Sequence, residues 1–247
     1  NPESMRFCGN CGSRLTGGVA APAPVSRQSK KGEDQLGIMV GADLAERMRR
    51  AGLEAAGQRR DETVLFVDIS GFTALSERLD VEDVYEIVQE YIQALSRCVY
   101  RYEGMIDKLA GDGLMALFGA PIAHENNAER AVRTAIEMQA EVQRLSLEFQ
   151  KKLGVELSAR LGLHSGPVIV GGIGSDLLMD YTAVGDTVNL AHRLEEVAPK
   201  GSILVSESVY RQTKAFFNYE TCPDLTLKGI SRPIDAYLFR GFKEKPA

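Results

Sequence analysis

The strongest constraint on the fold is a hairpin signal at residues 105–118. Two apolar stretches, Met105–Leu109 and Leu114–Phe118, flank a four-residue segment of sequence AGDG. An Asp-Gly pair between two apolar stretches of strand length is a strong signal for an antiparallel hairpin. These two stretches are therefore expected to lie side by side in a sheet.

Patterns on both sides of this hairpin predict the topology. An apolar β-branched strand at Thr63–Ile69 is followed by a helix capped by Asp80, and a second helix and a strand at Val155–Leu163 follow the hairpin. Apolar positions recur every three or four residues at Val84, Val88, Tyr91, Leu95, Val99 and Tyr102 in the first helix, and at Ala128, Ala131, Ala135, Met138, Val142, Leu145 and Phe149 in the second. The order predicts an α/β (α+β) fold with a ferredoxin-like βαββαβ core.

The rest of the chain is expected to elaborate this core at its C-terminal end. The predicted elements are a second, extended hairpin from Pro167 to about Ala183, a helix capped by Asp186 and running through Val197, a strand at Ile203–Val205, a short helix at about Glu207–Thr213, and a final strand at about Asp235–Phe239.

The first 60 residues differ in character from this domain. Residues 1–16 contain Cys8 and Cys11 in a C-x-x-C-G knuckle typical of half a zinc ribbon. Structural zinc needs four ligands, so zinc would bind only if the missing half is supplied; an inert tail, or zinc shared between two chains, is the alternative. Residues 17–37 have linker composition, and 38–60 are predicted to form a connecting helix before the domain at 61–242.

The composition gives no sign of a nucleic-acid or membrane partner. The net charge of −5 over 247 residues does not favour nucleic acid, and no apolar stretch approaches the roughly 20 residues of a membrane span. The cysteine pattern suits a reducing compartment, so we expect a cytoplasmic protein. His124, His164 and His192 show no ligand spacing, and Cys98 and Cys222 are expected to be packing residues.

Two carboxylates are candidates for chemistry because of where they lie. Asp68 ends the first predicted strand and Asp112 occupies the hairpin turn, and these elements are neighbours in the expected sheet. Carboxylates without nearby histidine or cysteine suit Mg²⁺ or Mn²⁺. Gly71, Phe72 and Thr73 follow at a helix start, where free N–H groups favour phosphate. Taken singly, a strand-end Asp and an Asp-Gly turn are also common structural features.

Three segments in order make the interpretation specific. Residues 66–73 (FVDISGFT), 108–113 (KLAGDG) and 184–194 (VGDTVNLAHRL) resemble the signatures of class III adenylyl and guanylyl cyclases. The resemblance extends over about residues 60–242. It implies the class III nucleotidyl cyclase fold and a reaction that converts a nucleoside triphosphate to a 3′,5′-cyclic nucleotide and pyrophosphate.

The resemblance also implies roles for individual residues. Asp68 and Asp112, with the Ile69 carbonyl, would hold two Mg²⁺ or Mn²⁺ ions. Asn189 and Arg193 match the pair that stabilises the transition state in this family. The metal residues and that pair come from different chains in the family, so a homodimer with two composite sites is implied.

The choice of base depends on two further positions. Lys108 matches the lysine that donates to adenine in adenylyl cyclases, and Thr182 is typical of the soluble and cyanobacterial-type subgroup. The resemblance therefore implies ATP as substrate, with bicarbonate stimulation as a hypothesis. Lys228 matches a lysine that reaches the triphosphate, whereas Pro167 stands where some members have a phosphate-binding arginine.

Three other functions share part of this sequence pattern. A guanylyl cyclase and a catalytically silent cyclase homology domain, which would serve dimerisation or sensing, remain alternatives. The silent domain would lack one of the metal, Asn or Arg residues, and none is missing here. A diguanylate cyclase is disfavoured because its Gly-Gly-acidic hairpin is absent.

Overall fold

The structure is a computed structural model that describes residues 57–120, 122, 124–175 and 178–243. The predicted knuckle with Cys8 and Cys11, the linker, and most of the predicted connecting helix lie outside these residues. In chain order the first elements are β1 (Gln58–Ile69), α3 (Phe72–Ser76), α4 (Val81–Arg101), β2 (Met105–Ala110), β3 (Gly113–Phe118), α5 (Asn127–Leu153) and β4 (Ala159–Ser175). This order confirms the βαββαβ core.

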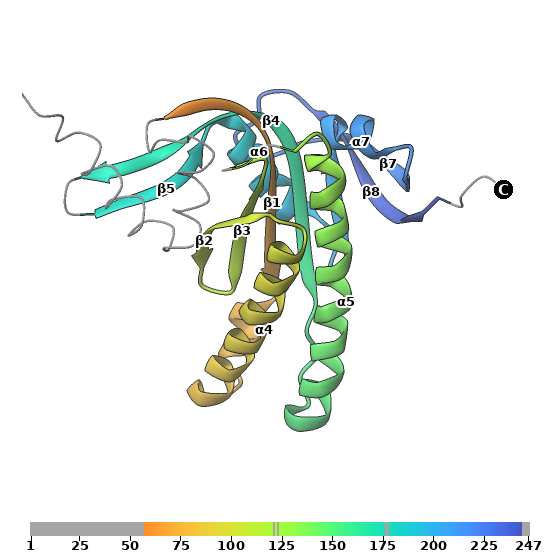
Figure 1. The fold of residues 1–247 in the computed structure, drawn as a ribbon. Helices are drawn as coiled ribbons and strands as arrows, with labels where there is room; N and C mark the ends of the chain where they lie inside the picture. Colours follow the sequence, from red (N-terminus) through yellow and green to blue (C-terminus); the bar gives the residue numbers. More distant parts are fainter. Residues whose placement is uncertain (1–56, 121, 123, 176–177, 244–247) are drawn as a thin grey trace, which may run out of the picture.

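The elaboration consists of β5 (Leu178–Val184), α6 (Asp186–Val197), β6 (Ile203–Ser206), α7 (Glu207–Thr213), β7 (Phe217–Leu225) and β8 (Ile234–Phe242). The sheet has the order β2-β3-β1-β4-β6-β8-β7, and β5 pairs with β4. The β4–β5 pair extends away from the body of the domain as an arm (Figure 1). None of the helices in the described ranges has an apolar stretch that would reach across a lipid bilayer.

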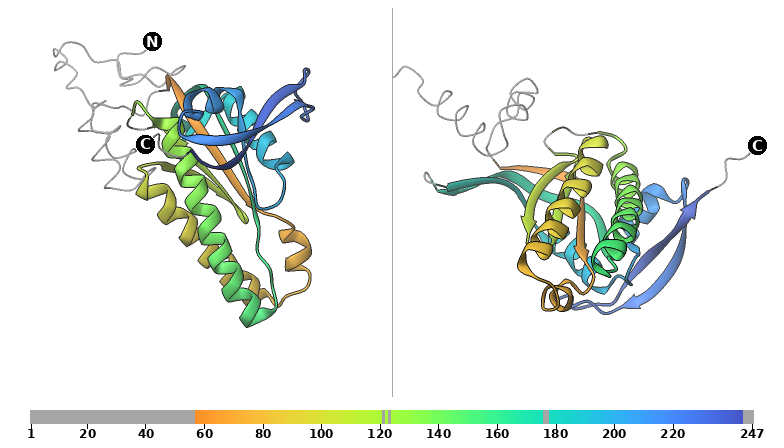
Figure 2. Two further views of the ribbon diagram at one scale, coloured as in Figure 1. Left: turned by 90° about the vertical axis from the view of Figure 1, so that its right-hand side faces the viewer. Right: turned by 90° about the horizontal axis from the view of Figure 1, so that it is seen from below.

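Helices cover both faces of the sheet, and the alternation of β1 explains why. Leu65, Val67 and Ile69 belong to a core cluster with residues of α4 and α5, whereas Val64 and Phe66 belong to one with Ala191 of α6. Successive strand residues point to opposite faces, so β1 is buried on both sides. Figure 2 shows α4 and α5 side by side on one face.

Several predicted boundaries were wrong. β1 begins at Gln58, so residues 58–60 form strand and not the end of the connecting helix. The strand predicted from Val155 starts at Ala159, although Val155 and Leu157 are buried in the core. β7 was missed, because most of its residues are exposed at the sheet edge and leave no apolar pattern.

The two predicted helix caps also differ in detail. Asp80 occupies the N-cap of α4 but makes no side-chain capping hydrogen bond. Asp186 is the first residue of α6, and Gly185 is its N-cap, with φ of 147°. The cap position of α6 thus has a backbone conformation that favours glycine.

Candidate active site

The two candidate metal carboxylates are brought together by the pairing of β1 with β3. Val67 pairs with Leu114, so the end of β1 lies beside the hairpin turn. A Cβ atom on Gly113 would lie 3.5 Å from Asp68 Oδ1. The Asp112 carboxyl accepts backbone hydrogen bonds from its own amide and that of Ile69, and burial, together with the adjacent Asp68, raises its pKa to about 7. Two carboxylates this close favour a cation between them.

The sequence prediction missed two charged residues next to Asp68, namely Arg160 and Glu195. Arg160 lies opposite Asp68 in the β1–β4 ladder, and its Nη2 atom is 3.2 Å from Asp68 Oδ2 and 3.2 Å from Glu195 Oε1. Glu195 is buried on α6, and burial raises its pKa to about 7. A lone arginine within an apolar strand was the available signal, since such a charge needs a partner.

The donor atoms at this edge fit a hard divalent cation. In the part of the chain that the structure describes, no group of three or more His, Cys, Asp or Glu side chains is arranged to hold a metal. Asp68 and Asp112 would therefore need a backbone oxygen such as that of Ile69, and oxygens from substrate or water. This ligand set, few carboxylates completed by phosphate, is the usual one for Mg²⁺.

The segment predicted to contact phosphate follows directly. Gly71 has φ of 79°, a conformation that favours glycine, and its carbonyl accepts a hydrogen bond from the Leu75 amide. α3 is five residues long and contains Phe72, which packs on the core, and Thr73, whose side chain is not described. The Lys200 ammonium lies 4.0 Å from the position of a Gly71 Cβ. A cation that sequence reasoning did not single out therefore lies beside this segment.

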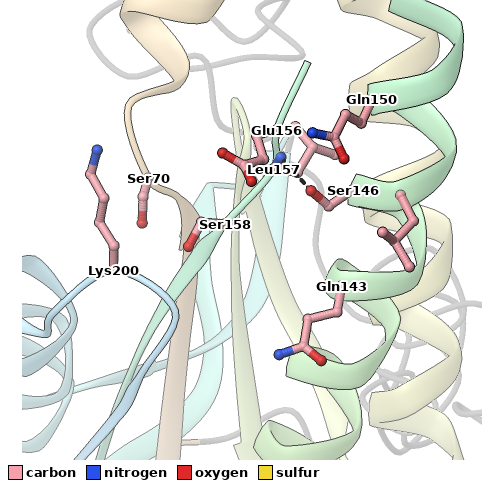
Figure 3. A pocket seen from close by; sticks show the side chains of 9 residues that line it. Ser70, Gln143, Ser146, Gln150, Glu156, Leu157, Ser158 and Lys200 are labelled. Atoms are coloured by element: carbon pink, nitrogen blue, oxygen red, sulfur yellow. Dashed lines mark hydrogen bonds between the residues drawn. The ribbon is translucent and has the colours of Figure 1, made fainter. Parts of the chain in front are cut away.

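A cavity of about 640 Å³ opens next to the same segment. Figure 3 shows Ser70, Ser158 and Lys200 on one side of it and the α5 residues Gln143, Ser146 and Gln150 on the other. The Ser146 hydroxyl accepts a hydrogen bond from the Leu157 amide. The cavity is therefore polar and reaches the segment between β1 and α3.

The predicted base-recognition residues are in contact although they are far apart in sequence. The Lys108 ammonium donates to the Thr182 hydroxyl at 3.0 Å, across the space between β2 and β5. Sequence reasoning missed a third member, Asp107. Its carboxylate accepts from the Thr182 hydroxyl at 2.9 Å and from the Ala183 amide at 3.2 Å, and it lies 3.2 Å from the Lys108 ammonium.

The predicted transition-state pair lies on α6 as expected. Leu190 and Leu194 pack inward, while Asn189 is exposed and Arg193 forms an ion pair with Glu196. That ion pair is the main reason why the pKa of Glu196 is lowered, and Lys228 lowers it further. Lys228 itself is exposed between β7 and β8.

Within the described part of one chain, the metal carboxylates have no direct polar contact with the predicted base-recognition and transition-state residues, although Arg160 bridges Asp68 and the Glu196 carbonyl of α6. No hydrogen bond or ion pair among the described residues joins Asp68 or Asp112 to Lys108, Asn189 or Arg193. Pro167, at the position of the missing arginine, is exposed and its carbonyl accepts from the Thr187 hydroxyl. Within the parts of residues 57–243 that the structure describes, a site that needs all of these residues is therefore not assembled by direct contacts inside a single chain.

Two histidines and two cysteines noted in the sequence are in contact with neighbouring side chains or buried in the core. The His164 Nδ1 atom lies 2.8 Å from the Ser206 hydroxyl, and burial lowers its pKa to about 4. The His192 ring lies against Phe66. Cys98 is buried and burial raises its pKa to about 12, while Cys222 packs at the edge of a core cluster. These contacts confirm a packing role for the two cysteines.

Comparison with known proteins places this geometry in a family. The model of the adenylate and guanylate cyclase catalytic domain matches residues 55–241. Adenylate cyclase 1 of Rhizobium meliloti is 33% identical over 197 residues, which cover 76% of this chain and 30% of that protein. The crystal structure of the adenylyl cyclase CyaB from P. aeruginosa has a TM-score of 0.74 at 34% identity, covering 78% of this chain and all of that one. The guanylyl cyclase Cya2 follows with a TM-score of 0.72 at 32% identity, covering 76% and 95%.

Proposed function

Because the chain belongs to the adenylate and guanylate cyclase catalytic domain family, we propose that it converts ATP to 3′,5′-cyclic AMP and pyrophosphate. The observation that carries the choice of ATP is the contact between Lys108 and Thr182. Lysine can only donate hydrogen bonds, and adenine offers an acceptor at N1, whereas guanine has N1–H there. The chain spans less than a third of the Rhizobium meliloti relative, so the proposal concerns this domain.

The roles of the residues follow from their positions. Asp68, Asp112 and the Ile69 carbonyl would hold two Mg²⁺ or Mn²⁺ ions, which when bound acidify the ribose 3′-hydroxyl and offset triphosphate charge. The 3′-hydroxyl releases its proton to solvent and its oxygen attacks the α-phosphorus. The bond from that phosphorus to the bridging oxygen of the β-phosphate breaks, and pyrophosphate leaves. Arg193 offsets the charge that develops on the phosphoryl group, and Asn189 positions the ribose. Gly71, Phe72, Thr73 and Lys228 bind the triphosphate.

We propose that the complete site forms between two copies of the chain. Asp68 and Asp112 of one protomer would meet Lys108, Thr182, Asn189 and Arg193 of its partner. The support is that no direct hydrogen bond or ion pair among the described residues joins these groups inside one chain, and that every chain has both sets. A two-fold symmetric homodimer then has two equivalent sites, and a monomer has none.

Guanylyl cyclase activity is the second candidate, favoured by the likeness to the guanylyl cyclase Cya2. A silent domain is disfavoured because the metal, Asn and Arg residues are all present. Bicarbonate stimulation stays a hypothesis that rests on the resemblance of Lys108 and Thr182 to one subgroup. The cytoplasmic location is likewise a proposal, which rests on the cysteine pattern.

The test is a cyclase assay of the purified protein with ATP and with GTP, in Mn²⁺, with and without bicarbonate. We expect cyclic AMP as the main product and its loss in Asp112→Ala. Asp61→Asn, which changes an exposed carboxylate outside the site, should retain activity. Predominant formation of cyclic GMP would overturn the proposal for the base, and undiminished activity of Asp112→Ala would overturn the metal site.

A further inference from the structure

Asp107 is the buried group in contact with both proposed base-recognition residues. Its side chain is fully buried, although it is on a short strand whose following residues are exposed. A carboxylate is rarely buried without a compensating set of donors. Here the donors are the Thr182 hydroxyl, the Ala183 amide and the Lys108 ammonium. The contacts therefore couple Asp107 to the recognition of the base.

An irregularity in β2 explains how neighbouring residues reach the same partner. Consecutive strand residues normally point to opposite faces. The pairing of β2 with β3 shifts register between Ile106 and Lys108, so that Asp107 is the extra residue. Such a bulge re-aims side chains and is frequent next to active sites. It allows both Asp107 and Lys108 to contact Thr182 on β5.

The hydrogen bonds fix the polarity of the Thr182 hydroxyl. A threonine hydroxyl has one hydrogen to donate and two lone pairs to accept. Its hydrogen is directed to Asp107 Oδ2, and one lone pair accepts from the Lys108 ammonium. A carboxylate cannot reverse this arrangement, because it only accepts. What Thr182 can still offer to a nucleotide is its second lone pair.

We propose that Asp107 is a positioning residue that makes Thr182 an obligatory acceptor and thereby selects adenine over guanine. The inference rests on the proposed nucleotide site and deepens it. Adenine presents its N6 amino group, a donor, where guanine presents O6, an acceptor. The free lone pair of Thr182 matches the adenine amino group and faces guanine O6 as a second acceptor. Lys108 keeps one of its three hydrogens for the ring nitrogen.

Asp107→Asn is the informative substitution because it replaces one acceptor oxygen of the carboxylate with an NH₂ donor. The Ala183 amide donates to Asp107 Oδ1, so the asparagine oxygen is expected to take that position and its NH₂ group to face Thr182. The Lys108 ammonium, half-exposed and 3.2 Å from Asp107 Oδ2, must then turn away from the NH₂ group. The Thr182 hydroxyl would then accept from the asparagine, and its hydrogen would be free to donate to guanine O6. Asp107→Ser is a second variant, since a serine hydroxyl can donate or accept and therefore does not fix the polarity of the Thr182 hydroxyl.

Two readouts are measured on the full chain: kcat/KM for ATP and GTP, and displacement of MANT-labelled ATP by unlabelled ATP or GTP. We expect the preference for ATP over GTP to fall about tenfold in Asp107→Asn, the effect of one hydrogen bond of reversed polarity. Asp107→Glu keeps an acceptor-only carboxylate and should keep more of the preference. Asp61→Asn makes the same charge change at an exposed position and should leave the preference intact.

The outcomes separate this inference from the proposed function. An unchanged preference in both asparagine and serine variants would overturn the role of Asp107, and so would a parallel loss with ATP and GTP, which indicates only a structural defect. A wild-type protein that forms no cyclic nucleotide would overturn the proposed function, while the displacement assay would still test base selection. Binding of neither nucleotide would overturn both.

Discussion

Gly162 on β4 offers a direct way to displace the helix that presents Asn189 and Arg193. A Cβ atom at this position would lie 2.1 Å from the Glu195 nitrogen and 2.5 Å from the Ala191 carbonyl oxygen. Both are backbone atoms of α6, so no side chain can rotate away. Glycine therefore allows the close approach of α6 to the sheet.

The expected effect of Gly162→Ala can be estimated from this contact. Ordinary van der Waals contact begins at 3.4 Å, so α6 must move outward by about 1.3 Å. Overpacking of this kind typically costs about 1–3 kcal/mol of unfolding free energy. A misplacement of about 1 Å in catalytic groups lowers activity by roughly a hundredfold. We therefore expect loss of activity out of proportion to the loss of stability.

The assay is kcat/KM for ATP combined with thermal unfolding followed by circular dichroism. We expect a melting temperature lower by about 2–4 °C for each kcal/mol, with most of the protein still folded at the assay temperature. Gly57→Ala is the matched control, because its new methyl group would meet only a side-chain atom of Ile169 at 3.2 Å. Wild-type activity and stability of Gly162→Ala would refute the described packing of α6.

Two further predictions concern buried ionisable side chains. Burial raises the pKa of Glu62 to about 8. Between about pH 4.5 and 8 the native state therefore keeps a proton that the unfolded chain has released. The free energy of unfolding should then fall with rising pH by up to about 1.4 kcal/mol per pH unit. Glu62→Gln should flatten that fall in melts from pH 5 to 8, and an unchanged slope would argue against it. Arg160→Met leaves the buried Glu195 without its ion-pair partner and should cost about 3 kcal/mol in urea unfolding. Adding Glu195→Gln should recover part of that loss; no recovery would contradict the pairing.

The core fold could be predicted from sequence because its signals are local. The Asp-Gly pair predicted the β2–β3 hairpin, although the two residues of the turn itself are Gly111 and Asp112. Every apolar position predicted for α5 is buried. β7 could not be predicted in this way, because it is an edge strand stabilised by pairing with β8 and not by an apolar stripe.

The candidate site likewise contains residues that local motifs predict and residues that they do not. Asp68, Asp112 and the Lys108–Thr182 pair were predicted from motifs, and the structure brings each pair together. Asp107, Arg160 and Glu195 were missed, because their importance comes from partners on other strands and helices. A bulge that shifts register between Ile106 and Lys108 has no signal in the sequence read alone.

Mixing two inactive variants tests the central claim most directly. Asp112→Ala removes a metal carboxylate and Arg193→Ala removes the transition-state arginine, so each homodimer lacks a complete site. If the site is composite, a mixed dimer contains one intact site, and random association should restore roughly a quarter of wild-type cyclic AMP formation from ATP. No recovery on mixing, in variants shown to fold and to exchange subunits, would contradict a site shared between two chains.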